Sequence, residues 1–253
     1  MLIGAQLYTI REFTQTVKDI EESFKKIAEI GYSCVQVSGL GFILPEKLRD
    51  IASANNLEII ITHTNPDRIL SDTENVINEH KVFGCKHIGI GCMPNKYHGS
   101  LEGCHAFIKD FTPAAIKLAD NGMKLHYHNH QFEYQKYSGK IIYDVLVNET
   151  DPEQWGFIPD TYWIAVGGRC PAKQLEMLTG RVDACHFKDL IIADNKQKYA
   201  PVLEGNLCWD EIFEACEKAG IKYAMVEQDD TYGIDPFEAL KISYNNLRKV
   251  GFR

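Results

Sequence analysis

Short apolar segments alternate with longer amphipathic segments along the whole chain. Eight of the short segments have the length and composition of buried strands, and they lie at residues 3–8, 34–37, 58–62, 87–90, 124–129, 156–159, 184–187 and 224–227. The segments between them carry apolar residues at helical spacing, as at Ile20, Phe24 and Ile27. This alternation is typical of βα units, in which each helix packs on a parallel sheet.

The eight units predict a fold of the α/β class, a single (β/α)8 TIM barrel over residues 1–253. No linker, composition break or low-complexity tract divides the chain, and a barrel of this kind usually needs about 250 residues. Two connections are longer than a barrel needs, residues 91–100 after the fourth strand and residues 188–210 after the seventh. Both would leave carboxyl ends of strands, where barrel active sites form, so we expect them to be substrate loops.

Charge and composition limit the kinds of molecule that the protein is expected to bind. The net charge of −8 argues against a nucleic acid or an anionic membrane, because both attract a cationic surface. The eight cysteines show no CxxC spacing, which indicates reduced thiols rather than a disulfide framework or a zinc finger. The chain contains neither a GxSxG elbow nor a Walker A loop. We therefore expect a cytoplasmic protein with a small-molecule substrate and no membrane partner. Assembly into a homo-oligomer is compatible with this composition.

Three metal-binding residue types stand at the ends of consecutive strands. Asp160 closes the sixth strand, His186 lies in the seventh and Glu227 closes the eighth. In a barrel these strand ends are adjacent and face one mouth, so their side chains can converge on one ion. The mixed oxygen and nitrogen set predicts one divalent metal ion, and Mn²⁺, Mg²⁺, Co²⁺ and Fe²⁺ suit it at least as well as Zn²⁺.

The fifth strand carries an unusual run of histidines. Strand alternation places His126, His128 and His130 on one face, and in a barrel that face can be the interior. Three imidazoles in an apolar interior would be costly without polar partners. One of them, or Glu133 just beyond the strand, is expected to complete the metal site or to act as an acid or base.

Other strand ends offer polar groups for a substrate. Gln6 and Tyr8 follow the first strand, and His63 ends the third, where it could bind hydroxyl groups or move a proton. Lys188 follows His186 directly and could bind a substrate oxygen or stabilise an oxyanion. Asp189, the next residue, suits a helix cap or a hydrogen-bond partner of the site.

The chain resembles the xylose isomerase-like superfamily, and within it the sugar phosphate isomerase/epimerase group. That group is related to tagatose/psicose 3-epimerases and inosose dehydratases. The resemblance rests on residues 4–11, 127–133, 160–163 with the glycine pair 167–168, 186–189 and 226–229. It implies one divalent ion held by a Glu, Asp, His, Glu set, of which Asp160, His186 and Glu227 match the last three. Many epimerases place the first glutamate within strand five. Here His126 or His128 stands there, and the resemblance implies that Glu133 or a histidine substitutes.

The resemblance implies a metal-dependent sugar isomerase or epimerase that works through a metal-stabilised enediolate. Glu227 would be one proton-transfer group and Glu133 or His128 the other, with Lys188 beside them. Gln6, Tyr8, His63, His130 and Trp163 would bind the sugar or polyol. The alternative is a lyase, dehydratase or keto-glycoside-cleaving enzyme acting on an inosose or 3-keto-sugar, since these reactions also begin by removing a proton beside a carbonyl. A sugar-binding barrel that has lost its metal is the non-enzymatic alternative.

Overall fold

Eight parallel strands form the centre of the protein, for which a computed structural model describes residues 1–253. Their order in the sheet is β8-β5-β4-β3-β2-β1-β12-β9, and two isolated bridges, Phe157 to Val182 and Asp160 to His186, join β8 to β9 and nearly close the barrel. The strands are β1 (Leu2–Gln6), β2 (Cys34–Val37), β3 (Glu58–His63), β4 (His87–Ile90), β5 (Lys124–His128), β8 (Trp155–Ile158), β9 (Ala184–Phe187) and β12 (Tyr223–Val226). The predicted TIM barrel is confirmed, and each predicted strand lies within two residues of an observed one.

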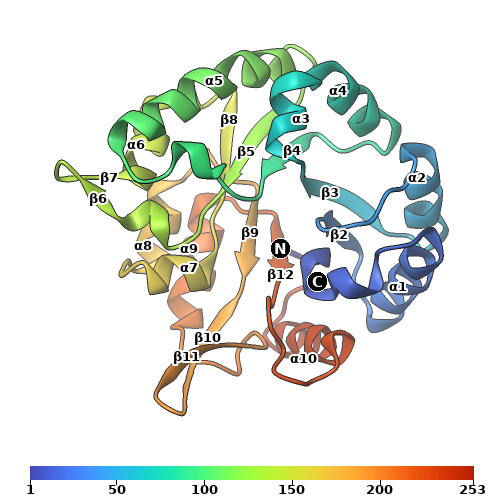
Figure 1. The fold of residues 1–253 in the computed structure, drawn as a ribbon. Coiled ribbons are helices and arrows are strands. Elements are labelled where there is room, and N and C mark those ends of the chain that lie inside the picture. Colours follow the sequence, from blue (N-terminus) through green and yellow to red (C-terminus); the bar gives the residue numbers. More distant parts are fainter.

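Helices surround the strands on the outside (Figure 1). They are α1 (Val17–Ile30), α2 (Pro45–Ala54), α3 (Pro66–Ser71), α4 (Thr73–Val82), α5 (Leu101–Ala119), α6 (Ile142–Glu149), α7 (Thr161–Val166), α8 (Pro171–Met177), α9 (Trp209–Ala219) and α10 (Pro236–Lys249), with short 3-10 helices η1 (Leu7–Phe13), η2 (Asn95–Tyr97) and η3 (Phe132–Tyr134). None of the helices is long and apolar enough to cross a bilayer.

Helix α1 illustrates how local sequence sets these elements. Thr16 caps its start, because the Thr16 hydroxyl accepts from the backbone N–H of Asp19 while the Asp19 carboxylate accepts from the backbone of Thr16. Its end is fixed by Gly31, whose φ of 119° lies in the left-handed region that glycine adopts without strain. Between these caps, Ile20, Phe24 and Ile27 are buried on the face that packs on the barrel.

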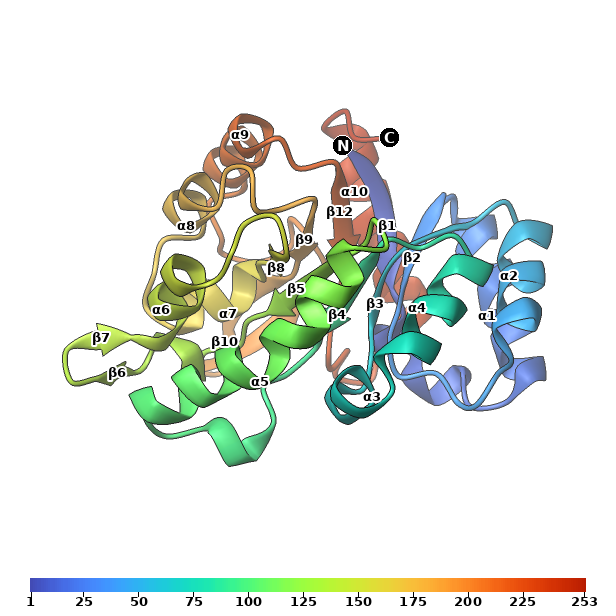
Figure 2. The same cartoon turned by 90° about the horizontal axis from the view of Figure 1, so that it is seen from above.

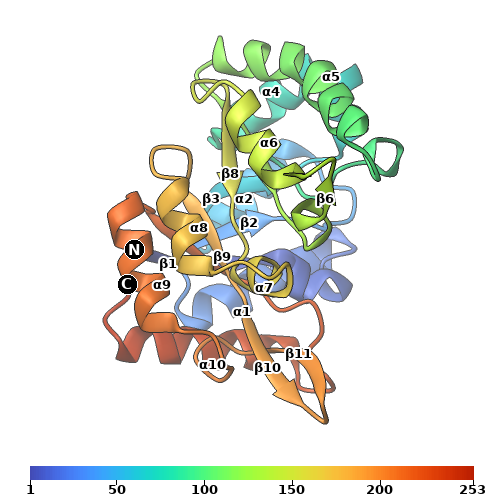
Figure 3. The ribbon, with the colours of Figure 1, turned by 90° about the vertical axis from the view of Figure 1, so that its left-hand side faces the viewer.

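Two hairpins extend from the barrel and were not predicted. The first pairs β10 (Asp189–Ala193) with β11 (Lys196–Ala200) inside the long connection after β9, and it projects away from the barrel in Figure 3. The second pairs β6 (Lys136–Tyr137) with β7 (Lys140–Ile141) after β5, and Figure 2 shows it at one side of the molecule. The connection 91–100 contains only η2.

The barrel interior is narrow and partly polar. Its apolar centre includes Cys34, Ile61 and Ile158, which pack separately from the large core between sheet and helices. Gly4 belongs to this crowded layer, since a Cβ there would lie 2.6 Å from side-chain atoms of Met225. Polar side chains occupy the interior on both sides of this layer, and those at the carboxyl ends of the strands form the site described next.

Candidate metal centre

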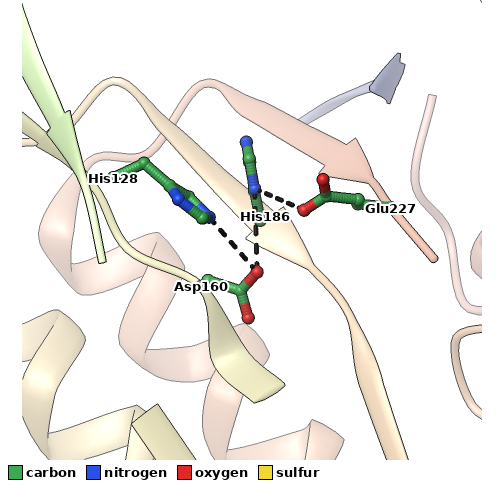
Figure 4. A group of neighbouring side chains, drawn as sticks. All are labelled: His128, Asp160, His186 and Glu227. Carbon is green, nitrogen blue, oxygen red and sulfur yellow. Dashed lines mark hydrogen bonds and ion pairs between the residues drawn. The ribbon is translucent and has the colours of Figure 1, made fainter. Parts of the chain in front are cut away.

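Four side chains of metal-binding type converge at the carboxyl ends of the strands. The ligand atoms of His128, Asp160, His186 and Glu227 all lie within 4.8 Å of one another, and all four residues are buried. His186 Nδ1 is 2.8 Å from Glu227 Oε2 and 3.7 Å from Asp160 Oδ2, and His128 Nε2 is 3.4 Å from that same Asp160 oxygen. Figure 4 shows the two imidazoles and two carboxylates directed toward one another.

The barrel order explains why these residues meet. His128 ends β5, Asp160 lies two residues beyond β8, His186 lies within β9 and Glu227 directly follows β12. These four strands are neighbours around the barrel once β8 and β9 are joined. The trio predicted from strand ends is therefore brought together, and His128 takes the fourth place.

Each histidine has one ring nitrogen held by an oxygen that can only accept a hydrogen bond. The Nδ1–H of His128 donates to the carbonyl of Gly91 at 3.0 Å, and the Nε2–H of His186 donates to Oε1 of Gln36 at 2.8 Å. In the neutral rings, the other nitrogens therefore present lone pairs to the centre of the group. This arrangement is typical of metal-binding histidines, whose outer N–H is fixed by a nearby acceptor.

Each carboxylate is held in the same way through one of its oxygens. Oδ1 of Asp160 accepts from the backbone N–H of Trp163 at 3.0 Å and thereby caps α7. Oε1 of Glu227 accepts from Nε2 of Gln6 at 2.6 Å. The remaining oxygens, Oδ2 and Oε2, face the imidazoles. All four side chains thus have one atom fixed by the protein and one directed at a common centre.

The charges at this centre do not balance. The ammonium of Lys188 lies 3.4 Å from Asp160, 3.2 Å from Glu227 and 2.7 Å from Asp229. With neutral imidazoles, one ammonium against three ionised carboxylates leaves an excess of two negative charges. Although burial opposes ionisation, Lys188 holds the pKa values of Asp160 and Glu227 below their ordinary range. A divalent cation would balance the group.

His186 responds to this excess of negative charge. Burial lowers its pKa, but the carboxylates of Glu227 and Asp160 more than offset the effect and raise the pKa to about 9. Its Nδ1 makes no well-oriented hydrogen bond even though Glu227 Oε2 is near. Two ligand atoms that are close but not hydrogen-bonded suit a shared ion, so the residues present fit a divalent metal, which would replace the proton on His186.

A cavity of about 600 Å³ opens beside this group, and two of the four residues, His128 and Glu227, line it. Most of its lining residues are polar, and they include the predicted residues Gln6, Tyr8, His63, His128, His130, Lys188 and Glu227. Ligand pockets are usually lined by apolar groups, so this polarity suits a hydroxyl-rich ligand. Trp163 is not part of the lining. Its ring instead packs 5.1 Å from the Lys188 ammonium and 5.4 Å from the His130 ring.

Glu133, predicted as a metal ligand and proton-transfer group, does not reach this cavity. The chain turns after β5 into η3, and this turn directs the Glu133 carboxylate away from the mouth. Its oxygens accept from the hydroxyl of Tyr127 at 2.5 Å and from the backbone N–H of His130 at 2.9 Å. The side chain is 0% exposed, and burial raises its pKa to about 7. The structure therefore corrects both roles for Glu133 and leaves it as a support for the loop that carries His130.

Asp229 was given no role by the sequence analysis, yet it lines the cavity and contacts Lys188. The signal was available, because Asp229 stands two residues after Glu227 and alternation places both on one side of the chain. Arg11 also lines the cavity, with its guanidinium 4.4 Å from the ring centroid of Tyr8. The carbonyl of Gly91, by contrast, could not be recognised as a partner of His128 from the sequence.

Comparison with known proteins agrees with the barrel fold. A profile described as xylose isomerase-like TIM barrel matches residues 24–250. A sugar phosphate isomerase/epimerase from Parabacteroides distasonis superposes with a TM-score of 0.83 at 22% identity, over 99% of this chain and 94% of that one. No curated protein sequence matches the chain.

Two further solved structures share the fold. The probable 3-DHS dehydratase AsbF, involved in petrobactin synthesis in Bacillus anthracis, superposes with a TM-score of 0.75 at 15% identity, over 98% of this chain and 99% of that one. A xylose isomerase-like TIM barrel protein from Mycobacterium smegmatis, solved in complex with magnesium, gives 0.76 at 13% identity, over 98% and 96%. At these identities the likeness concerns the fold alone.

Proposed function

The chain belongs to the xylose isomerase-like TIM barrel family, and on that premise we propose that it is a divalent-metal-dependent sugar isomerase or epimerase. The observation that carries this proposal is the convergence of His128, Asp160, His186 and Glu227, each with one donor atom fixed and one free, beside a polar cavity that His128 and Glu227 line. These four residues would hold the divalent ion, which would supply Lewis-acid stabilisation of the negative charge that develops on substrate oxygens.

Residues of the chain supply the proton transfers. Glu227 lines the cavity while Gln6 holds its Oε1, so the carboxylate is positioned to take a proton from the carbon beside the carbonyl. Lys188, fixed beside Glu227 and Asp229, can donate a hydrogen bond to a substrate oxygen. Its ammonium stays charged, because the surrounding carboxylates raise its pKa although burial opposes the rise.

A lyase or dehydratase is the second candidate, and the position of Glu133 favours it. With Glu133 turned away, Glu227 is the only glutamate that lines the cavity. Epimerisation by two opposed bases needs another group on the far side of the substrate. A β-elimination needs one base and an acid for the departing hydroxyl, and Glu227 and Lys188 provide such a pair.

Metal analysis tests the shared part of both candidates. We expect purified protein loaded with Mn²⁺ to retain about one ion per chain. Asp160→Asn, which removes a negative ligand, should lose it, while Glu214→Gln on the exposed face of α9 should keep it. Full retention of the ion by the Asp160 variant would contradict the proposed centre.

Incubation with keto-sugars and inososes in deuterated buffer separates the two reactions. Deuterium at the carbon beside the carbonyl, together with recovery of an isomer, indicates an epimerase or isomerase. Irreversible loss of water indicates a dehydratase. In either case Glu227→Gln should reduce exchange by about 100-fold or more, because a positioned base contributes roughly 10²–10⁴-fold. Exchange that proceeds equally well in this variant would exclude Glu227 as the base.

A further inference from the structure

A second group of metal-type ligands lies at the opposite end of the barrel interior. His87 is the first residue of β4, His126 lies in β5 two residues before His128, and Asp183 immediately precedes β9. The ligand atoms of the three lie within 4.8 Å of one another. His87 Nδ1 is 2.9 Å from His126 Nε2 and 4.0 Å from Asp183 Oδ2.

We propose that His87, His126 and Asp183 form a second metal site, at the amino-terminal end of the barrel, which binds Zn²⁺ or a similar transition-metal ion. Ligand atoms about 2.0–2.1 Å from one zinc ion are separated from each other by roughly 3 Å, so the two imidazole nitrogens already have the required spacing. Two imidazoles and one carboxylate favour zinc, cobalt, nickel or copper over Mg²⁺ or Ca²⁺, which prefer oxygen ligands.

The carboxylate is oriented for this role by a neighbouring residue. Lys222 Nζ donates to Oδ1 of Asp183 at 2.9 Å, and this contact leaves Oδ2 facing His87. Hydrogen bonding of the outer oxygen is the usual support for a metal-binding carboxylate. The side chains of His87 and Asp183 are 25% and 26% exposed, so an ion can enter from solvent and keep water as a further ligand.

The buried imidazole of His126 can occupy its position because Gly156 on the adjacent strand β8 has no side chain there. A Cβ on Gly156 of β8 would lie 2.5 Å from Nδ1 and Cε1 of His126, closer than real Cβ atoms approach any neighbour. The absence of a side chain at 156 therefore lets the ring lie across β8 with Nε2 toward His87. His126 Nδ1 has no hydrogen-bond partner, and the ring is 1% exposed. When the His126 ring carries its proton on Nδ1, the lone pair of Nε2 is directed toward His87 and can be donated to an ion.

An ion at this site would connect the two sides of the junction between β8 and β9. Only the bridges Phe157 to Val182 and Asp160 to His186 join β8 and β9. His87 and His126 belong to strands on one side of that junction, whereas Asp183 belongs to the segment on the other side. A bound ion would therefore tie the two sides together, and its effect should be seen in the stability of the whole protein.

Zinc binding to the full chain tests the proposal in an Asp160→Asn background. This substitution removes a ligand of the mouth site, the group formed by His128, Asp160, His186 and Glu227, so that zinc bound there does not contribute. We expect this protein, incubated with Zn²⁺ and passed through a desalting column, to retain about one zinc per chain. Addition of His87→Gln should abolish that retention. Addition of His105→Gln, which alters an exposed histidine paired with Glu149 on the outer surface, should leave it intact.

Thermal unfolding gives an independent readout. Zinc at about a hundredfold excess over its Kd should raise the Tm of the Asp160→Asn protein by roughly 5 °C or more. The increase should disappear with His87→Gln and also with Asp183→Asn, whose folded state is checked by circular dichroism. Zinc retention or a Tm increase that survives both substitutions overturns the proposal, as does a failure of the Asp160→Asn protein to bind zinc. Neither result depends on whether the mouth site is catalytic.

Discussion

At the scale of single residues, the site depends on side chains that hold the proposed ligands in position. Gln36 is the clearest case, because its amide oxygen fixes the Nε2–H of His186 and so leaves Nδ1 free for an ion. Gln6 plays the matching part for Glu227, although it also lines the cavity. Loss of such a support should weaken metal binding without removing any ligand.

Gln36→Leu is therefore expected to lower Mn²⁺ affinity about 10-fold to 100-fold, since His186 loses the acceptor that sets its tautomer. Isothermal titration calorimetry of the metal-free protein measures the change. Gln197→Leu on the exposed β11 strand is the matched control. An unchanged affinity in a folded Gln36→Leu protein would show that the ring is oriented by other contacts.

Glu133 predicts a pH dependence of stability. Its folded pKa of about 7 is raised above the ordinary carboxyl value by burial, so the folded state holds the proton more tightly than the unfolded chain does. The resulting stabilisation is fully present below about pH 4.5 and is lost as pH rises through about 7. Across this window wild-type protein should lose up to about 3 kcal/mol relative to Glu133→Gln.

Urea unfolding of both proteins at several pH values between 4.5 and 8 measures this difference. The comparison isolates Glu133, because every other titrating group is common to the two proteins. Parallel stability curves for wild type and variant would mean that the Glu133 carboxyl titrates at its ordinary value.

At the scale of elements, the barrel strands follow directly from the sequence, whereas the additions to them do not. The barrel strands are short apolar runs at regular spacing, so the sequence alone predicts their number and their order along the chain. The β10–β11 hairpin alternates weakly, and its turn at Asp194 and Asn195 has no glycine, although both residues adopt positive φ. Its position depends on long-range contacts that no local pattern records.

The fourth ligand was hidden for a similar reason. Alternation correctly places His126 and His128 on one face, but it cannot say how deep each lies in the barrel. Two residues along a strand span about 7 Å, which is enough to put one imidazole at the mouth and the other at the base. Glu133 was misplaced because the direction of a chain after its strand ends is set by packing, here by the contact with Tyr127.

Asp189 anchors the β10–β11 connection and gives the element-scale prediction. Its carboxylate accepts from the backbone N–H groups of Leu203 at 2.9 Å and Gly205 at 3.0 Å and from the indole of Trp209 at 2.6 Å. Asp189→Ala should leave these donors unpaired and reduce the free energy of unfolding by about 1–3 kcal/mol. Hydrogen exchange should rise across residues 190–207.

Asp194→Ala at the hairpin tip is the matched control for this experiment, since the exposed Asp194 carboxylate contacts only Lys198. It should leave both stability and exchange almost unchanged. Equal behaviour of the two variants would indicate that the connection is held by apolar packing rather than by Asp189.

At the scale of the whole molecule, the mouth site spans the junction that closes the barrel. His128 and Asp160 come from the β5–β8 side, and His186 and Glu227 come from the β9–β12 side. Because an ion held by all four residues would bind only the closed arrangement, its binding free energy would add to the stability of the entire fold. We expect Mn²⁺ to raise the Tm of metal-free wild-type protein by several degrees, as measured by calorimetry.

The same addition should leave the Tm of the Asp160→Asn protein unchanged, while Glu214→Gln should behave as wild type. An unchanged Tm of the wild-type protein on addition of Mn²⁺ would mean that ion binding does not stabilise the closed barrel, or that no ion binds.

The packing of Trp163 also gives the protein an optical probe of its own centre. Trp163 follows the ligand Asp160 by three residues, and its indole lies against Lys188 and His130. The other two tryptophans, Trp155 and Trp209, are almost fully buried in the packing between sheet and helices. Paramagnetic Mn²⁺ at the mouth should therefore quench the emission of Trp163 selectively. Fluorescence can then report occupancy of the centre in dilute solution, before any substrate has been identified.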